Sequence, residues 1–333
     1  MAPATGSPQP GNLLEVRDLT IAFPSSQNPL LAADGVNFDV AAGRTVGLVG
    51  ESGCGKSVTL RSLLGLVPYP GEVISGEIRW QGEDLREAPK KRMAEVRGSE
   101  ISMVFQDPTS CLNPVFTVGD QITETLRKRA GMNGRDAKKR AIELLDQVGV
   151  PSAEQRLKAY PHQFSGGMRQ RVMIAIAIST RPKLLLADEP TTALDVTTQE
   201  EILALLVEVQ GETGMAVVLV SHDLGVISET CDDVFVMYAG KVLEAGRGPA
   251  VMRSPRHPYT GGLIEAMPSL EVTDAPPASP IPGQPPNLAD LPPGCPFSPR
   301  CRFSRPECDS IPVALDAPLA DHGSACPFEG TKA

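Results

Sequence analysis

A glycine-rich segment next to a lysine and a serine could bind phosphate groups. The 333-residue chain reads GESGCGKS at residues 50–57. Glycines let backbone N–H groups approach an anion closely, while Lys56 can neutralise the β- and γ-phosphates and Ser57 can bind Mg²⁺. An apolar run at 45–49 precedes this segment and helix-forming residues follow it, which is the context that a phosphate-binding loop requires. The segment therefore predicts nucleotide binding.

Two adjacent carboxylates follow an apolar run. Residues 184–187 are Leu-Leu-Leu-Ala, and Asp188 and Glu189 come directly after them. Placing paired acids at the end of a buried strand is costly unless a cation or a proton compensates their charge. One carboxylate could hold Mg²⁺, and the other could act as a general base toward water.

A second glycine pair occurs in the sequence FSGGMRQR at residues 164–171. A helix pattern begins at this point, and a helix N-terminus offers free N–H groups and a positive dipole end to an anion. Ser165, Gly166 and Gly167 could therefore approach a phosphate group. One chain with two anion cradles suggests a nucleotide held between two protomers.

Four of the seven cysteines lie near the C-terminus, at Cys295, Cys301, Cys308 and Cys326. Their intervals lack the close pair that structural zinc sites usually contain, and the first and last precede proline, as in a ferredoxin run. We expect a structural [4Fe–4S] cluster, with zinc or free thiols as the alternatives. Four bound thiolates would staple a segment that is poor in apolar residues.

The elements that must position these groups alternate between strand and helix. Short alternating segments at 14–16 and 36–40 indicate antiparallel strands. Buried-strand and helical patterns then follow one another, which predicts an α/β fold with a mostly parallel sheet covered on both faces. The expected strands are 45–49, 101–105, 184–187, 216–220 and 234–237, and the expected helices are 56–66, 137–148, 167–180 and 198–210.

The expected organisation has three parts. Residues 1–11 form a Pro/Ser-rich flexible tail without the features of a signal peptide. Residues 12–254 form the nucleotide-binding domain, with a helical subdomain inserted at about 107–180. Residues 255–333 form an irregular Pro/Cys-rich extension.

Composition excludes several classes of protein. Hydrophobic residues make up 41% and charged residues 21%, which is ordinary for a chain that buries a full core. A net charge of −9 and only 4% aromatic residues argue against a nucleic-acid partner. No apolar run approaches the roughly 18 residues of a membrane span, so we expect a cytosolic chain.

The motifs at 50–57, 164–171 and 184–189, taken together, resemble those of ATP-binding-cassette (ABC) ATPases from residue 13 to about 248, with departures at Phe164 and Met168. The resemblance implies a P-loop core, a small antiparallel β subdomain and an inserted helical subdomain. It also implies that Asp188 holds Mg²⁺, that Glu189 is the general base, and that Gln106 and His222 contact the metal, water or γ-phosphate.

The resemblance assigns the nucleotide contacts as well. Phe23 would stack on adenine, and Asp195 belongs to a loop that crosses between protomers. Mg²⁺ would be held by Ser57, Gln106 and Asp188. The expected ATP-binding residues are Phe23, Ser52, Gly53, Cys54, Gly55, Lys56, Ser57, Val58, Ser165, Gly166, Gly167 and Asp195.

The segments RHPYTGGL at 256–263 and IPG at 281–283, followed by the cysteines, resemble ATPase subunits of oligopeptide and dipeptide importers. The resemblance implies a peripheral subunit at the cytoplasmic face of the membrane. Its partners would be two membrane-spanning permease subunits, an extracytoplasmic peptide-binding protein and a second ATPase subunit, as a heteromer in preference to a homodimer. The alternatives are a soluble, non-transport ABC ATPase or an importer of glutathione or nickel chelates.

Overall fold

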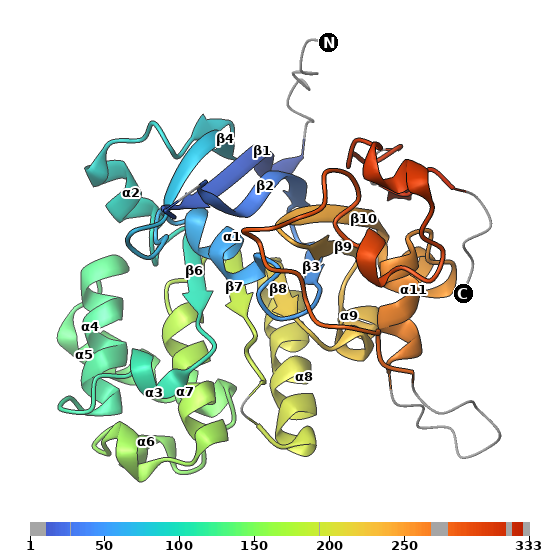
Figure 1. Ribbon diagram of the computed structural model, residues 1–333. Coiled ribbons are helices and arrows are strands. Elements are labelled where there is room, and N and C mark those ends of the chain that lie inside the picture. The colour runs from blue at the N-terminus through green and yellow to red at the C-terminus, as the bar shows by residue number, and fades with distance from the viewer. Residues whose placement is uncertain (1–10, 27, 193, 268–278, 318–321, 329–333) are drawn as a thin grey trace, which may run out of the picture. The chain divides into compact units, whose positions relative to one another are not determined.

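The computed structural model describes residues 11–26, 28–192, 194–267, 279–317 and 322–328. The chain forms two compact units (Figure 1). The first unit contains residues up to 87 and from 219 onward, and the second contains residues 88–218. Strand β8 (Ala216–Ser221) begins in the second unit and ends in the first.

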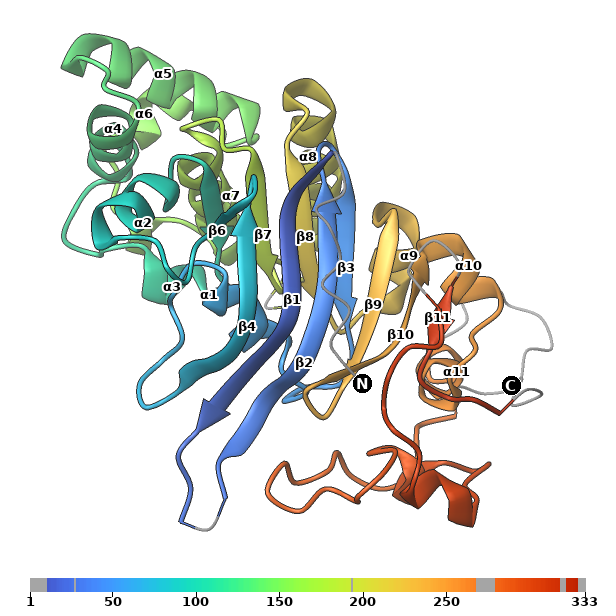
Figure 2. The same ribbon diagram turned by 90° about the horizontal axis from the view of Figure 1, so that it is seen from above.

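The first unit contains a four-stranded antiparallel sheet in the order β2-β1-β4-β5. Figure 2 shows the long strand β1 between β2 and β4. Val16 pairs with Phe38 on one side and with Ile78 on the other, and all three side chains are buried. Alternation of apolar and polar residues thus places one face in the core, as the sequence predicts. The strands are β1 (Asn12–Phe23), β2 (Leu30–Ala41), β4 (Glu72–Trp80) and β5 (Glu83–Asp84).

The same unit contains strands of a second, mostly parallel sheet. Strand β3 (Thr45–Val49) runs parallel to β9 (Asp233–Tyr238), and every residue of both strands is buried. Strands β10 (Lys241–Arg247) and β11 (Gly323–Ser324) continue antiparallel from β9. The helices of this unit are α1 (Lys56–Ser62), α9 (Leu224–Thr230), α10 (Gly248–Arg253), α11 (Pro258–Glu265) and the short 3-10 helices η2 (Ser298–Arg300) and η3 (Pro306–Asp309).

The second unit contains the parallel strands β6 (Ile101–Val104) and β7 (Leu184–Asp188). Every regular element between these two strands is a helix. Helices α4 and α5 place apolar side chains such as Ile122 and Leu144 in a buried core. The helices of this unit are α2 (Lys90–Val96), α3 (Pro108–Cys111), α4 (Val118–Arg129), α5 (Gly134–Gln147), α6 (Ala153–Arg156), η1 (Pro161–Gln163), α7 (Gly166–Ile178) and α8 (Val196–Thr213).

The prediction of an α/β protein with an antiparallel sheet and a parallel-rich sheet is confirmed. Helix boundaries follow capping side chains that hydrophobic patterns do not reveal. Thr117 and Asp120 form a capping box at the start of α4, and Asp195 caps α8 ahead of the residue where the sequence places its start. Among the described residues, no helix is both long enough and apolar enough to span a membrane.

Candidate nucleotide site and C-terminal cysteine pocket

Residues 50–55 form a tight loop between β3 and α1, and Lys56 and Ser57 begin the helix. Two of the loop's three glycines are required by close packing, because a Cβ on Gly50 would lie 2.1 Å from the Met237 carbonyl oxygen. A Cβ on Gly55 would lie 2.1 Å from the Ala32 carbonyl oxygen, and both glycines have a positive φ. The loop can therefore bring its backbone N–H groups close to an anion at the start of α1.

Lys56 folds back over this loop. Its ammonium donates hydrogen bonds to the carbonyl oxygens of Gly50 at 2.6 Å and Glu51 at 2.9 Å, and the residue is 4% exposed. The neighbouring Cys54 is also buried, and burial raises the pKa of its thiol. A positive charge held against the loop, with Ser57 at the first turn of α1, can neutralise phosphate groups bound there.

Two residues that sequence reasoning missed also hold the loop. The Tyr259 hydroxyl accepts a hydrogen bond from the Glu51 N–H at 2.8 Å, and Arg300 forms a two-pronged ion pair with the Glu51 carboxylate. This pair raises the pKa of the Arg300 guanidinium above its ordinary value. No local pattern indicates these contacts, because they join residues more than 200 positions apart.

In the second unit, the structure brings Gln106 and Glu189 together at the carboxyl ends of β6 and β7. The Gln106 side-chain amide donates to Glu189 Oε2 at 3.1 Å, and the Thr192 hydroxyl donates to the same oxygen at 2.9 Å. Glu189 has a φ of 46°, in the left-handed region that non-glycine residues seldom adopt. Its carboxylate is thus aimed by two donors and an uncommon backbone conformation, which suits a general base.

Asp188 precedes this glutamate as the last residue of β7. It is fully buried. A buried carboxylate is unfavourable unless a cation or hydrogen-bond donors compensate it, and carboxylate oxygens are preferred ligands of Mg²⁺. The position of Asp188 therefore fits a metal ligand at the end of the strand.

Ser165 and Asp195 lie on the same cavity of about 350 Å³ in the second unit. Ser165 caps α7 and accepts a hydrogen bond from the Met168 N–H at 3.2 Å. Gly166 and Gly167 line the same cavity, and a Cβ on Gly167 would lie 2.7 Å from a Thr198 methyl group. The Thr198 amide and hydroxyl hold the pKa of the Asp195 carboxyl below its usual range. The absence of a side chain at Gly167 thus lets the start of α7 pack closely against Thr198 at the wall of this cavity.

The two remaining predicted contacts lie in the first unit. His222 is exposed and follows β8 directly. Phe23 ends β1 with a half-buried ring, and a Cβ on Gly71 would lie 2.5 Å from the ring carbons. Phe23 therefore packs over Gly71, and its role toward adenine stays a prediction.

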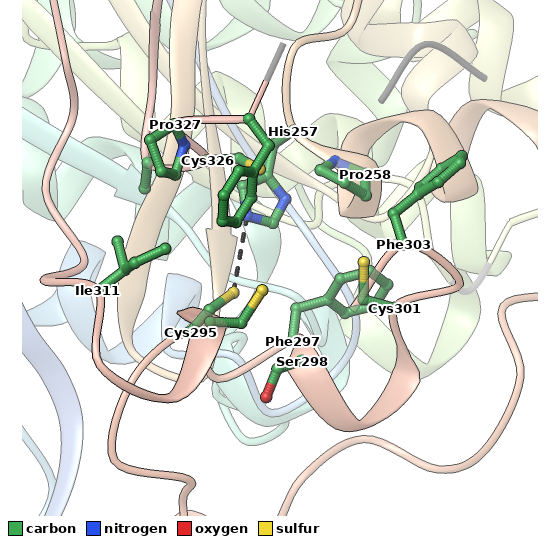
Figure 3. Close-up of a pocket in the computed structure, with 13 residues that line it drawn as sticks. His257, Pro258, Cys295, Phe297, Ser298, Cys301, Phe303, Ile311, Cys326 and Pro327 are labelled. Atoms are coloured by element: carbon green, nitrogen blue, oxygen red, sulfur yellow. Dashed lines mark hydrogen bonds between the residues drawn. The ribbon is translucent and has the colours of Figure 1, made fainter. Parts of the chain in front are cut away.

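The four C-terminal cysteines line one small pocket of the first unit, together with His257 (Figure 3). His257 Nδ1 accepts from the Tyr259 N–H at 3.1 Å, and His257 Nε2 lies 3.9 Å from Cys295 Sγ. Burial lowers the pKa of His257 to about 3, so the ring is neutral at pH 7 with its proton on Nε2. Burial, with the other cysteines nearby, raises the pKa of Cys295 to about 11.

Convergence of the cysteines does not by itself give a metal centre. Within the described part of the chain, no group of three or more His, Cys, Asp or Glu side chains is arranged to hold a metal ion. Without a ligand, thiols with raised pKa values pack as small apolar groups. The predicted cluster, or its zinc alternative, therefore stays a proposal.

An aromatic cluster anchors the cysteine segment to β9 and α11 within the first unit. The Phe297 ring centroid lies 5.4 Å from that of Tyr238 on β9 and 5.2 Å from that of Tyr259 on α11. The Tyr238 and Tyr259 centroids are 4.6 Å apart. The sequence predicts that four bound thiolates hold this segment together. The packed rings provide an additional, apolar contact that fixes it.

Glu244 ties the same region together from inside. It is fully buried on β10 and accepts from the backbone N–H groups of Arg256 at 2.8 Å and His257 at 2.9 Å. Its Oε1 also lies 2.6 Å from His322 Nε2. One carboxylate therefore joins β10, the start of α11 and the segment leading into β11.

We expect Glu244→Ala to lower the free energy of unfolding of the first unit by about 3 kcal/mol, because it leaves one buried and one partly buried backbone N–H group without their acceptor. Chemical denaturation, with amide hydrogen exchange on α11, measures the effect. Glu212→Ala, on the exposed face of α8, is the control and should change the free energy by less than about 0.5 kcal/mol. Equal stability of the two variants would contradict the assignment.

Comparison with known proteins identifies the family. Residues 33–192 match the ABC transporter family, and residues 243–308 match the C-terminal region of oligopeptide/dipeptide transporters. A putative peptide import ATP-binding protein of Brucella abortus is 49% identical over 95% of this chain and 94% of its own length. The chain belongs to the ABC transporter family of peptide import ATP-binding proteins.

Other members of this ABC family are similar over nearly their whole length. The oligopeptide transport ATP-binding protein OppD of Salmonella typhimurium is 47% identical over 93% of this chain and 92% of its own. The dipeptide transport ATP-binding protein DppD of Escherichia coli is 44% identical over 95% of this chain and 96% of its own length. A dimeric ATP-binding cassette solved with ADP and Pi matches with a TM-score of 0.63 at 28% identity, covering 70% of this chain and 98% of that one.

Proposed function

We propose that this chain hydrolyses ATP to drive a membrane importer of peptides. The observation that carries the proposal is the presence of two matched regions in one chain, an ABC transporter region at 33–192 and an oligopeptide/dipeptide transporter C-terminal region at 243–308. The relatives that match this chain over nearly their whole length carry names that refer to peptide import, oligopeptide transport and dipeptide transport.

The phosphate loop would bind the β- and γ-phosphates of ATP. Backbone N–H groups from Gly53 to Ser57 surround the phosphates in this proposal, and Lys56 exchanges its loop carbonyl partners for phosphate oxygens. Ser52, Cys54, Gly55 and Val58 would contribute further contacts from the loop and the first turn of α1. Phe23 would lie against the adenine ring.

Glu189 would accept a proton from the attacking water. Its orientation by Gln106 and Thr192 supports this role, because a general base must hold one geometry. Mg²⁺ would be held by Asp188, Gln106 and Ser57, and when bound it would neutralise charge on the β- and γ-phosphates. His222 would contact the γ-phosphate.

A complete site would require a second ATPase subunit. Ser165, Gly166 and Gly167 would contact the γ-phosphate of the nucleotide bound by the partner's loop, and Asp195 would lie at the crossing between protomers. The cavity shared by these residues supports the proposal, as does a similar cassette solved as a dimer with ADP and Pi. We favour a heteromer over a homodimer.

The remaining partners follow from the importer assignment. Two membrane-spanning permease subunits would form the pore, and an extracytoplasmic peptide-binding protein would deliver the cargo. The chain would work peripherally, at the cytoplasmic face of the membrane. Residues 12–254 would form the ATPase domain, with a helical subdomain at about 107–180, and residues 255–333 the extension.

Copurification of the tagged chain in a mild detergent tests the assignment. The proposal expects two integral membrane proteins and an ATPase to elute with the chain. Nucleic acid or ribosomes in their place would support a soluble ABC ATPase acting as a mechanical switch and would overturn the proposal. A third outcome is that the purified complex takes up glutathione or a nickel chelate in preference to peptides. That result would keep the assignment as an importer and change the assigned cargo.

The cysteine pocket would hold a [4Fe–4S] cluster, with Zn²⁺ as the alternative. Two observations support a fit: four thiols line one pocket, and His257 Nε2 faces Cys295 Sγ. A bound cluster would supply positive charge to four thiolates and cross-link four points of the segment. The chain's own contribution is to exclude water with Phe297 and its neighbours.

Iron and labile sulfide analysis of anaerobically purified protein tests the cluster. We expect about four iron atoms per chain, lost on Cys295→Ser because one ligand is removed. Cys111→Ser, an exposed cysteine of the second unit, is the control and should retain all the iron. Stoichiometric zinc without iron would contradict the cluster and support the alternative.

A further inference from the structure

Glu51, in the phosphate loop, is held at three points. Its carboxylate pairs with Arg300, at 2.5 Å from Nη1 to Oε2 and 2.9 Å from Nη2 to Oε1. Its backbone N–H donates to the Tyr259 hydroxyl at 2.8 Å, and its carbonyl oxygen accepts from the Lys56 ammonium at 2.9 Å. Two of these three partners come from the C-terminal part of the chain.

The Arg300 side chain is itself fixed in place. Only 7% of it is exposed, its Nε donates to the Pro282 carbonyl oxygen at 2.8 Å, and its Nη1 lies 3.3 Å from the Tyr238 hydroxyl. A bidentate guanidinium–carboxylate pair that is partly buried, as here, sets both the distance and the orientation of the two side chains. Arg300 therefore acts as a rigid support of Glu51, unlike the mobile partner of an exposed ion pair.

Tyr259 is anchored with equal firmness. It is fully buried in the first turn of α11, against the rings of Tyr238 and Phe297. Its N–H donates to the ring of His257, which faces Cys295. Arg300 immediately precedes Cys301. Both supports of Glu51 thus come from the segments that build the cysteine pocket.

We propose that Arg300 and Tyr259 are positioning residues for ATP, which make the C-terminal extension a structural part of the nucleotide site. The inference rests on the proposed binding of ATP at this loop. A loop held in its binding conformation before ATP arrives loses less conformational entropy on binding, so its affinity is higher. Neither residue needs to touch the nucleotide.

Arg300→Met tests the proposal by removing the ion pair while keeping an apolar stem. We expect the KM for ATP and the Kd for a fluorescent ATP analogue to rise about tenfold, with kcat at saturating ATP within about twofold of the wild type. In this variant part of the binding free energy of ATP is used to order the loop, which weakens the affinity. The rate at saturation is retained because Glu189 and Gln106 are unchanged. A role in folding alone would lower the active fraction, and hence kcat, without moving KM.

Arg302→Met is the matched control. Arg302 lies two residues further along the same segment and also forms a two-pronged pair, with Glu265 of α11 at 3.0 and 2.6 Å. Among the described residues, no hydrogen bond or ion pair joins it to the phosphate loop. Its KM for ATP should equal that of the wild type. Equal KM values for the Arg300 and Arg302 variants would overturn the proposal.

A double-mutant cycle with Glu51→Gln separates the ion pair from other effects. The combined variant should bind the ATP analogue no more weakly than either single variant, because both remove the same interaction. Fully additive losses would contradict a role through Glu51. A wild-type protein that binds no ATP analogue would instead reject the proposed function, which is a distinguishable result.

Discussion

Glu189→Gln should lower the steady-state rate of ATP hydrolysis by about 10²- to 10⁴-fold, the usual contribution of a general base. Glutamine keeps an oxygen that can accept hydrogen bonds from Gln106 and Thr192, so the geometry at the end of β7 should persist. What is lost is the ability to accept a proton from water. The variant should therefore bind ATP with near wild-type affinity and accumulate as an ATP-bound dimer or heteromer.

The measurement is phosphate release under saturating MgATP, together with size-exclusion chromatography in ATP and in ADP. Glu212→Gln is the matched control, because Glu212 lies exposed on α8 and its side chain contacts Gln147. That variant should hydrolyse ATP at the wild-type rate. An unchanged rate for Glu189→Gln would show that Glu189 is not the base.

Lys56→Met should weaken ATP binding by about 100-fold. A hydrogen bond to a charged group contributes about 1.5–3 kcal/mol, and each 1.4 kcal/mol corresponds to tenfold in affinity. Lys56 is also buried against the loop, where its ammonium closes onto Gly50 and Glu51. Hydrolysis at subsaturating ATP should therefore fall by about the same factor in this variant.

Titration with a fluorescent ATP analogue measures the loss. Lys128→Met is the control, since Lys128 pairs with Glu124 on the exposed face of α4. Its Kd should match the wild type, and circular dichroism should show both variants folded. A folded Lys56→Met protein with wild-type affinity would remove Lys56 from the nucleotide site.

Short-range features of the site could be predicted from the sequence. The phosphate loop, the glycine pair at Gly166 and Gly167, and the acids at Asp188 and Glu189 each form a contiguous motif whose spacing reflects local backbone geometry. The strand at 45–49 has the predicted boundaries for the same reason, since an uninterrupted apolar run is bounded by turn-forming residues. The convergence of the four cysteines also followed from residue type alone.

Contacts between distant segments could not be predicted in this way. Arg300 and Glu51 are 249 residues apart, and nothing around either residue indicates its partner. The positive φ of Glu189 and its contact with Thr192 depend on how the chain leaves β7, which apolar patterns do not encode. The lowered pKa of His257 likewise results from burial among residues that are distant in sequence, such as Phe297.

The central claim is that ATP hydrolysis by this chain drives peptide import. The complex captured through the tagged chain is reconstituted into liposomes with ATP enclosed at the nucleotide-binding side. The peptide-binding protein is added on the opposite side with a labelled peptide, so that peptide uptake is measured directly. The account predicts peptide accumulation that requires ATP and is lost when Glu189→Gln replaces the wild-type chain. Accumulation that persists without ATP, or ATP hydrolysis with no peptide uptake in an intact complex, would contradict it.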